Sequence, residues 1–221
     1  MKKNFTEIVF ILDESGSMAD LKGDTIGGFN SLIEKQKAEA GEAVVSTVLF
    51  STESRVLHDR VPIEEIGKMT DKDYCPGGGT ALLDAVGDAV KHIGNIHKYA
   101  RDEDVPEHTL FVITTDGMEN SSRHFTADKV KKIISRQQEK YGWEFVFLGA
   151  NIDSAETAES IGIGRATAVD YCCDTVGCAV QYDAMCEAVS TVRKGSKLSA
   201  SAAWRKDVDA DHKRRKGAGN H

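Results

Sequence analysis

The sequence predicts a doubly wound α/β fold with a mostly parallel, six-stranded sheet flanked by helices. Strand-sized apolar stretches alternate with helix-sized amphipathic stretches along most of the 221 residues. Two apolar stretches, residues 8–12 and 110–113, are unbroken, which is typical of central parallel strands covered on both faces. Only a few residues, 51–53 and little more, separate the second and third strands. This gap is too short for a crossover helix and predicts an antiparallel hairpin at one edge.

The elements follow from these patterns in order along the chain. We expect strands over residues 6–12, 43–50, 56–61, 109–115, 144–148 and 167–171. We expect helices over residues 20–37, 81–98, 126–141, 154–161 and 175–193. The second helix has the clearest apolar face, because Leu82, Val86 and Val90 follow the 3.6-residue period. The first helix contains Gly23, Gly27 and Gly28, each costing about 1 kcal/mol against alanine, so tertiary packing is expected to stabilise it.

Length and composition indicate one globular domain with a C-terminal extension. At roughly 150 residues per domain, 221 residues favour a single domain, which we place at residues 1–195. Residues 205–216 contain six basic side chains, and Gly-Ala-Gly-Asn-His ends the chain. We therefore expect residues 196–221 to form a basic, flexible tail. No apolar run approaches the roughly 20 residues of a membrane span, so no membrane association is expected.

Charge and cysteine content limit the classes of partner and compartment. The formal net charge of −7 disfavours nucleic acid as a main partner. The apolar stretch near the N-terminus is short and is followed at once by Asp13 and Glu14, unlike a secretory signal. Five cysteines, an odd number, indicate free thiols in a reducing compartment. Together these features predict a cytoplasmic protein.

The strongest functional signal is a set of oxygen-bearing side chains at the ends of expected strands and helices. Asp13, Ser15 and Ser17 alternate in the loop after the first strand. Thr80 follows Gly77-Gly78-Gly79 at the start of the second helix, and Asp116 follows the strand over 109–115. Carboxyl ends of parallel strands meet at one sheet edge, so these groups are expected to converge. Hard oxygen donors of this kind suit Mg²⁺, with Mn²⁺ as the alternative ion.

The same residues also have simpler interpretations. Asp13 to Ser17 also fits a helix-capping turn, because Asp and Ser are good N-caps. We expect Glu14 to lie on the surface and Asp153 to cap the helix that follows it. Glu119 and Asn120 are expected to shape the loop after Asp116. A haloacid-dehalogenase-type phosphatase also begins with an apolar strand ending in Asp, but it needs a second carboxylate where this chain has Ser15.

Two other site types fit less well. A phosphate-binding P-loop needs a lysine before its Ser or Thr, and Gly79 stands at that position. Four cysteines fall within fifteen residues, which invites a zinc site, but no C-x₂-C pair is present. We expect ordinary buried thiols instead. These four are Cys172, Cys173, Cys178 and Cys186; Cys75 is expected to be exposed.

These residues resemble the von Willebrand factor type A (VWA) domain family. Its metal-ion-dependent adhesion site (MIDAS) has the pattern D-x-S-x-S, then Thr, then Asp-Gly, matched by Asp13, Ser15, Ser17, Thr80 and Asp116. The resemblance spans roughly residues 5–193 and implies the strand order 3-2-1-4-5-6. The free cysteines favour the intracellular bacterial or phage type over the adhesive extracellular members.

The resemblance implies a Mg²⁺-dependent protein-interaction module and no enzyme activity. Ser15 and Ser17 would bind the ion directly, and Asp13 and Asp116 directly or through water. Thr80 would bind directly in an open state of the site. An Asp or Glu of a protein partner would complete the coordination. In better-known members of the family, exchange of Thr for Asp as a direct ligand accompanies movement of the final helix. The corresponding helix here is the one expected over residues 175–193. We expect at most a partial shift of this helix.

Overall fold

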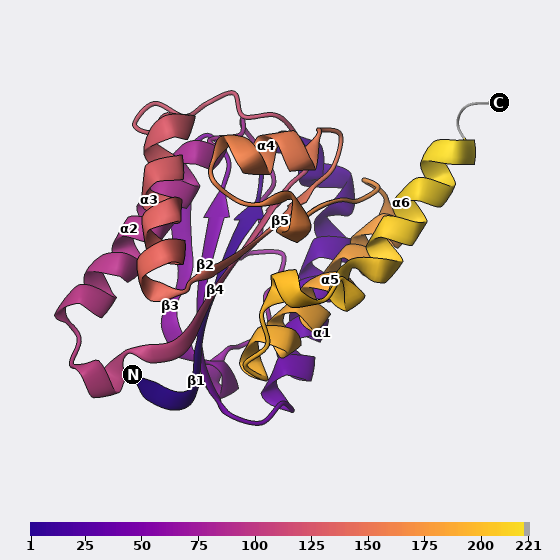
Figure 1. Cartoon of the computed structure of the whole chain (residues 1–221). Helices are drawn as coiled ribbons and strands as arrows, with labels where there is room; N and C mark the ends of the chain where they lie inside the picture. Colours follow the sequence, from indigo (N-terminus) through magenta and orange to yellow (C-terminus); the bar gives the residue numbers. More distant parts are fainter. Residues whose placement is uncertain (219–221) are drawn as a thin grey trace.

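The structure, a computed structural model, describes residues 1–218 and has six strands and six α-helices within that range (Figure 1). The strands are β1 (Lys2–Asp13), β2 (Glu42–Phe50), β3 (Ser54–Pro62), β4 (Pro106–Thr115), β5 (Glu144–Gly149) and β6 (Ala168–Asp170). The helices are α1 (Lys22–Lys37), α2 (Leu82–Tyr99), α3 (Ala127–Tyr141), α4 (Ser154–Ser160), α5 (Thr175–Arg193) and α6 (Lys206–Ala218). All predicted strands and helices are present, within a few residues of their expected bounds.

The strands form one sheet in the order β3-β2-β1-β4-β5-β6. Every neighbouring pair is parallel except β2 and β3, which are antiparallel and place β3 at the edge. The predicted fold class, strand order and edge hairpin are therefore confirmed.

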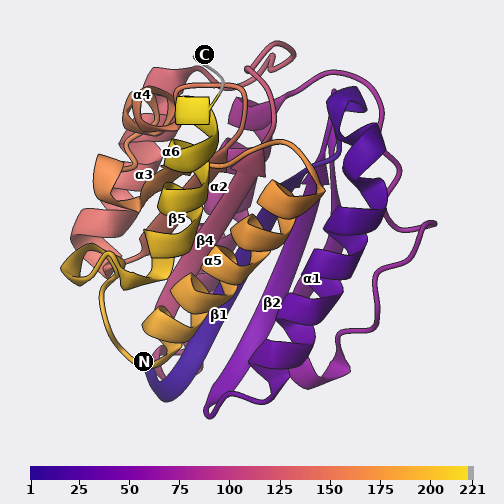
Figure 2. The same cartoon turned by 90° about the vertical axis from the view of Figure 1, so that its right-hand side faces the viewer.

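Helices cover both faces of the sheet (Figures 1 and 2). Along β1, Ile8, Phe10 and Leu12 belong to the core shared with α1, α5 and α6, whereas Val9 and Ile11 belong to the core shared with α2, α3 and α4. Successive side chains of a strand point to opposite faces, so a strand buried on both sides is apolar at every position. This explains the unbroken apolar run in the sequence.

The sheet register aligns the ends of the central strands. Asp13 at the end of β1 pairs with Phe50 of β2, and Leu12 pairs with Thr114 of β4. Asp116 therefore follows a strand that ends beside β1. The segment 63–81 returns from β3 to the same edge along α1, where Asn30 exchanges hydrogen bonds with the backbone of Met69 at 2.8 and 2.9 Å. This return places Thr80 at the edge where Asp13 and Asp116 lie.

The C-terminal segment differs from the predicted tail. Residues 206–218 form α6, which packs against α5 and β6 beside residues 203–205 (Figure 2). Leu198, Trp204 and Val208 are buried in the core on this face. Of the six basic residues that suggested a tail, Arg205 and Lys206 lie between Trp204 and Val208, and the other four follow Val208. Residues 219–221 of the predicted tail lie outside the described residues.

No helix within residues 1–218 is long and apolar enough to cross a membrane.

Candidate metal centre

Asp13 anchors the loop that follows β1. Its side chain is buried, and its Oδ1 accepts the backbone N–H of Ser15 at 2.7 Å. Its Oδ2 accepts the hydroxyl of Thr115 at 2.7 Å and the backbone N–H of Asp116 at 3.3 Å. One carboxylate thus joins its own loop to the end of β4. The alternation of Asp, Ser and Ser in the sequence arises because this short loop turns back on Asp13.

The two predicted serines and Asp116 converge at one point. The Ser17 hydroxyl donates to Asp116 Oδ1 at 2.7 Å, and the Ser15 hydroxyl lies 3.4 Å from the same oxygen. The two hydroxyl oxygens are 3.0 Å apart. Ser15 and Asp116 are buried, whereas Ser17 is exposed. The cluster is therefore built into the sheet edge but reaches solvent through Ser17.

Thr80 is held beside this cluster by its backbone. Its N–H donates to Asn120 Oδ1 at 2.9 Å, and its carbonyl accepts the N–H groups of Asn120 and Ser121 at 3.0 and 3.3 Å. The Thr80 hydroxyl oxygen lies 4.0 Å from the position that a Cβ on Gly117 would take. The residue is buried and adjacent to the Asp116 loop. The structure thus brings all five predicted site residues to one edge of the sheet.

The glycines before Thr80 permit this close approach. A Cβ on Gly79 would lie 2.2 Å from Ser121 Oγ and 2.8 Å from Asn120 Oδ1. Gly78 has a φ of 77°, which disfavours other residues, and its carbonyl accepts the N–H of Gly16 at 3.1 Å. Small residues are therefore needed where the loop before α2 meets the other two loops.

Burial raises the pKa of Asp13, and the nearby negative charge of Asp116 raises it further. The hydrogen bonds from Ser15 and Thr115 oppose that increase. Two carboxylates at a buried edge repel each other unless a cation lies between them. The electrostatics of the cluster therefore favour a bound cation.

Glu14 does not lie on the surface, contrary to the prediction from the sequence. Its carboxylate is buried, accepts two hydrogen bonds from Arg55 at 2.8 and 3.2 Å, and accepts the backbone N–H of Cys75. The side chain does point away from the serines. The Glu14 carboxylate contacts the segment that returns to Thr80. Because this segment lies some sixty residues further along the chain, the sequence pattern around Glu14 does not reveal the contact.

The loop after Asp116 is shaped by the side chains of Glu119 and Asn120, as predicted. Glu119 accepts backbone N–H groups of its own loop, those of Ser121 at 2.9 Å and Ser122 at 2.8 Å. It also accepts the N–H of Leu83 in α2 at 2.9 Å. The predicted cap is confirmed as well, because Asp153 accepts the N–H of Glu156 at the start of α4.

Sequence reasoning missed Asp84. Its carboxylate accepts three consecutive backbone N–H groups, those of Arg123, His124 and Phe125, at 2.7–3.0 Å. It therefore fixes the far end of the Asp116 loop to the first turn of α2. An acidic residue in the first turn of a helix looks ordinary in sequence, so no local signal reveals this role.

The cysteines are free thiols among the described residues, and two differ from the expected burial. Cys178 and Cys186 are buried, but Cys172 and Cys173 are partly exposed. Cys173 Sγ lies 3.9 Å from Asp116 Oδ2, and burial, with the charge of Asp116, raises the pKa of its thiol. Cys75 is exposed, as expected.

The donor set fits a hard divalent cation and not zinc in a cysteine site. Within residues 1–218, no three His, Cys, Asp or Glu side chains group closely enough to hold a metal ion. The cluster instead offers three hydroxyls and two carboxylates, those of the five predicted residues. Oxygen donors alone are typical of Mg²⁺ and Mn²⁺ sites.

Solved structures with a similar fold are found by comparison. The chain matches the ArnB paralog VWA2 from Sulfolobus acidocaldarius over 85% of its length, with a TM-score of 0.53 and 18% identity. The fold is that of a VWA domain. A match to proximal thread matrix protein 1 of the mussel byssus covers 84% of the chain, with a TM-score of 0.57 and 11% identity. One structure of that mussel protein has zinc in its MIDAS motif.

A third VWA-fold structure, the manganese-loaded TRAP protein of Plasmodium vivax, matches 81% of the chain with a TM-score of 0.54 and 16% identity. The chain spans about half the length of the first two proteins, 48% of the mussel protein and 45% of VWA2, and 72% of TRAP. At these identities the likeness establishes the fold alone. Comparison with known protein families and with curated proteins finds no match.

Proposed function

We propose that this VWA-fold chain is a Mg²⁺-dependent protein-interaction module of the intracellular bacterial or phage type. Asp13, Ser15, Ser17, Thr80 and Asp116 would hold the ion, with Mn²⁺ as the alternative. The supporting observation is the convergence of the Ser15 and Ser17 hydroxyls on Asp116 Oδ1, within 3.4 Å and beside buried Asp13. The metal-loaded sites of the mussel and Plasmodium proteins support a divalent ion in this fold.

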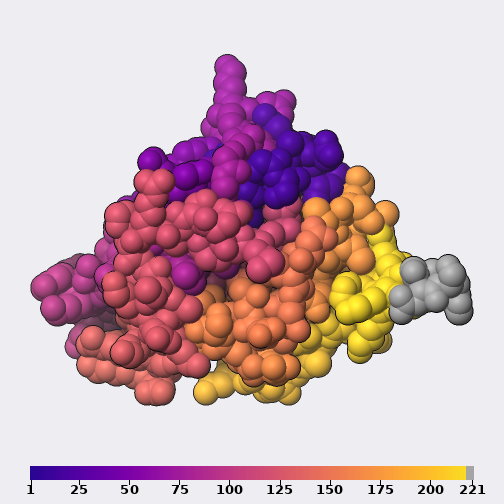
Figure 3. All heavy atoms as spheres, turned by 90° about the horizontal axis from the view of Figure 1, so that it is seen from above, coloured from indigo at the N-terminus to yellow at the C-terminus, as the bar shows by residue number. Residues whose placement is uncertain are grey.

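The partner would present an Asp or Glu carboxylate. Bound there, the divalent ion would supply positive charge and an open coordination position. Only two of the five proposed ligands are carboxylates, and the other three are neutral hydroxyls. A divalent ion held by this set would therefore keep positive charge available to an outside anion. Ser17 is exposed at this edge of the sheet. Figure 3 shows the molecule from above, where the N-terminal segment (indigo), the middle of the chain (magenta to pink) and the segment that contains α4 (orange) border one another. The site is thus accessible to a second protein.

A metal titration tests the ion. Isothermal calorimetry with Mg²⁺ is expected to show one saturable site in the wild type. Ser17→Ala and Thr80→Ala should weaken it at least tenfold, whereas Ser31→Ala on the outer surface of α1 should not. Equal binding by all four proteins would refute the proposed ligands.

A water-relaxation measurement tests the carboxylate. Mn²⁺ bound to the protein relaxes the water molecules it coordinates, so a carboxylate that replaces one lowers the relaxivity. Glutarate, which resembles a glutamate side chain, should lower it in the wild type, and the neutral amide glutaramide should not. A pull-down with and without EDTA would then identify the natural partner. If saturating glutarate left the relaxivity unchanged, the bound ion would have no coordination position open to a carboxylate.

We propose no intrinsic catalysis. The thiol of Cys173 lies 3.9 Å from Asp116 Oδ2, and burial, with the charge of Asp116, raises its pKa, which disfavours the nucleophilic thiolate. The free thiols also support the proposed cytoplasmic location, because reducing compartments keep thiols unpaired. Turnover of a generic phosphate ester by the wild type that disappears in Asp13→Asn would overturn the first of these proposals.

A further inference from the structure

Thr80 is the one proposed metal ligand that does not come from the end of a β-strand. The other four residues lie at the ends of β1 and β4 or just after them, whereas Thr80 precedes α2. The pairing of β1 with β4 aligns the two strand ends, but it does not fix the loop before α2. The position of Thr80 therefore depends on contacts with the loops around it.

Asn120 contacts both backbone polar groups of Thr80. Its Oδ1 accepts the Thr80 N–H at 2.9 Å, and its own N–H donates to the Thr80 carbonyl at 3.0 Å. Thr80 is only 4% exposed, so its N–H would lack an acceptor if the Asn120 side chain were removed. Because Asn120 comes four residues after Asp116, these two hydrogen bonds join the loops that carry two of the proposed ligands.

The loop that carries Asn120 is itself fixed to α2 on both sides of this residue. Glu119 accepts the N–H of Leu83 at 2.9 Å, and the Ser122 hydroxyl accepts the N–H of Asp84 at 3.0 Å. Both donors belong to the first turn of α2. Asn120 is thus held close to the start of the helix, where it can keep Thr80 in place.

The surroundings of Asn120 Oδ1 would suit a carboxylate as well as an amide. The atom accepts two hydrogen bonds, from the Thr80 N–H and from the Ser121 hydroxyl, the latter at 2.6 Å. A carboxylate oxygen is a stronger acceptor than an amide oxygen, so Asp at this position would hold Thr80 at least as firmly. Asp would also add a third negative charge beside Asp13 and Asp116. The amide supplies the acceptor without that charge.

We propose that Asn120 is a positioning residue of the metal centre. It fixes Thr80 so that the threonine hydroxyl can reach the ion, and its neutrality leaves positive charge on the ion for the carboxylate of a partner. This inference rests on the proposed function and deepens it. It explains why an amide, and not the stronger acceptor, occupies a position that needs only an acceptor.

Hydrogen exchange in EDTA tests the hold on Thr80 without any metal. In Asn120→Ala the Thr80 amide should exchange at least tenfold faster than in the wild type, as measured by NMR, because it has lost its acceptor. In Asn120→Asp, which keeps the acceptor, it should exchange at the wild-type rate or more slowly.

Calorimetry with Mg²⁺ tests whether Asn120 acts through Thr80. Asn120→Ala should bind Mg²⁺ at least tenfold more weakly than the wild type, and Asn120→Asp should bind it equally or more tightly. In a Thr80→Ala background, Asn120→Ala should cost less than about twofold more, because the residue it positions is already gone. A merely structural role would give the same loss in both backgrounds.

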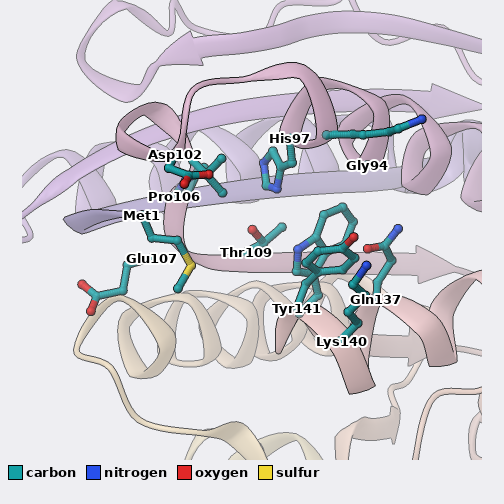
Figure 4. A pocket seen from close by; sticks show the side chains of 13 residues that line it. Met1, Gly94, His97, Asp102, Pro106, Glu107, Thr109, Gln137, Lys140 and Tyr141 are labelled. Carbon is teal, nitrogen blue, oxygen red and sulfur yellow. The ribbon is translucent and has the colours of Figure 1, made fainter.

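A matched control carries the same change of charge elsewhere on the surface. Asn95 is exposed on α2, and its neighbour Gly94 lines the pocket at the end of this helix that lies away from Thr80 (Figure 4). Asn95→Asp should leave the exchange of the Thr80 amide and the Mg²⁺ affinity as they are in the wild type.

Glutarate binding at saturating Mn²⁺, followed by water relaxation, tests the neutrality of Asn120. Asn120→Asp should bind glutarate at least tenfold more weakly than the wild type or Asn95→Asp, although it binds the metal at least as tightly. Loss of structure would weaken both affinities, so changes in opposite directions identify an effect of charge at this position.

The outcomes separate this inference from the proposed function. An unchanged Thr80 exchange rate in Asn120→Ala would refute the positioning role, whether or not a metal binds. Equal glutarate affinity of Asn120→Asp and the wild type would refute the role of neutrality, even if Asn120→Ala fails to fold. A wild type that binds no Mg²⁺, or Thr80→Ala that binds it normally, would refute the proposed ligands and with them any action of Asn120 on the ion.

Discussion

Asp13 and Asp116 are 1% and 2% exposed and lie at neighbouring strand ends, joined by the hydrogen bond from the Asp116 N–H to Asp13 Oδ2. Two carboxylates in so little space oppose folding when no cation is bound. Replacing Asp116 by Asn removes one charge and keeps the shape. The Ser15 and Ser17 hydroxyls that now donate to it can rotate to accept from an amide.

We therefore expect Asp116→Asn to unfold at the same or a higher temperature than the wild type in EDTA. Mg²⁺ at 100 times its Kd should stabilise the wild type by about 2.7 kcal/mol and the variant not at all. Differential scanning fluorimetry with EDTA and with Mg²⁺ measures both effects, with the exposed Asp20→Asn as control. A variant that is already unfolded in EDTA would show the carboxylate to be structural instead.

The glycines of the Thr80 loop give a second prediction at the residue scale. Gly79→Ala would place a methyl group 2.2 Å from Ser121 Oγ, whereas Gly77→Ala meets nothing within 4 Å. The first change should separate the loops and weaken Mg²⁺ at least tenfold, and the second should leave it within about twofold. Calorimetry measures the Mg²⁺ affinity of the two variants, which have the same amino-acid composition. Equal affinities would mean that Thr80 does not depend on this close approach.

Single residues also show where sequence reasoning ends. Asp13, Ser15 and Ser17 were predictable because one short loop sets their spacing, and Asp116 because it follows a clear strand. Glu14 was misplaced because the partners that bury it, Arg55 and the backbone of Cys75, come from other parts of the chain. Alternation along a loop indicates which side chains point apart, but not what a returning segment will cover.

At the scale of elements, Asp84 fixes the Asp116 loop to α2. Burial raises the pKa of its carboxyl, but the three backbone N–H donors from residues 123–125 outweigh this and lower the pKa overall. Asp84→Ala removes the acceptor of all three. It should reduce the free energy of unfolding by about 1–3 kcal/mol at pH 7, as measured with urea, because the donors lose their partner.

The same contact predicts a pH dependence. A carboxyl with a lowered folded pKa adds stability that is complete above its unfolded pKa of about 3.9 and is lost as the pH falls through the folded value. The difference between wild type and Asp84→Ala should thus be largest near neutral pH and shrink below about pH 4. A constant difference from pH 7 to pH 3 would show that the charge of Asp84 contributes nothing.

Helix α6 is the element that the sequence did not reveal. Val208 is buried between charged neighbours, and the residues around it read as a solvated segment. Only contact with α5 and β6 shows that this side of the helix is covered. Helix α2 was predictable because several apolar positions repeat along it at the 3.6-residue period, a pattern that α6 lacks.

Val208→Asp should lower the free energy of unfolding by about 3 kcal/mol, because it buries an unpaired charge. Ala210→Asp, on the exposed side of the same helix, should cost less than about 1 kcal/mol. Urea unfolding of the two variants distinguishes a packed helix from a detached tail. If both behave alike, α6 does not pack in solution.

The whole molecule places the candidate metal centre at the carboxyl ends of β1 and β4. These two strands are parallel neighbours with apolar cores on both faces. A parallel sheet buried on both sides is rigid, because its interior is close-packed. The sheet therefore holds Asp13 and Asp116 in place, and any large movement would have to come from the outer helices.

Helix α5 is the one whose movement the VWA resemblance implies, and its contacts oppose such movement. Near its C-terminus, Arg193 donates to the Gly41 carbonyl at 2.8 Å and to Gln36 Oε1 at 3.2 Å. Gln36 in turn donates to Ser190 Oγ at 2.9 Å. In the middle of α5, the Tyr182 ring fills the space beside Gly28 of α1, where a Cβ would clash at 2.3 Å.

A shift of α5 would break these contacts and displace α6, which packs on it. Moving such an equilibrium from 1:99 to 99:1 requires about 5.5 kcal/mol of differential ligand affinity. We therefore expect a rigid docking site, and the test is hydrogen exchange across residues 175–193 in EDTA, in saturating Mg²⁺, and in Mg²⁺ with saturating glutarate. Exchange should be the same in all three, while the backbone amides of residues 13–18 slow when the ion binds. Faster exchange of α5 with glutarate present would instead show a switch that these contacts only restrain.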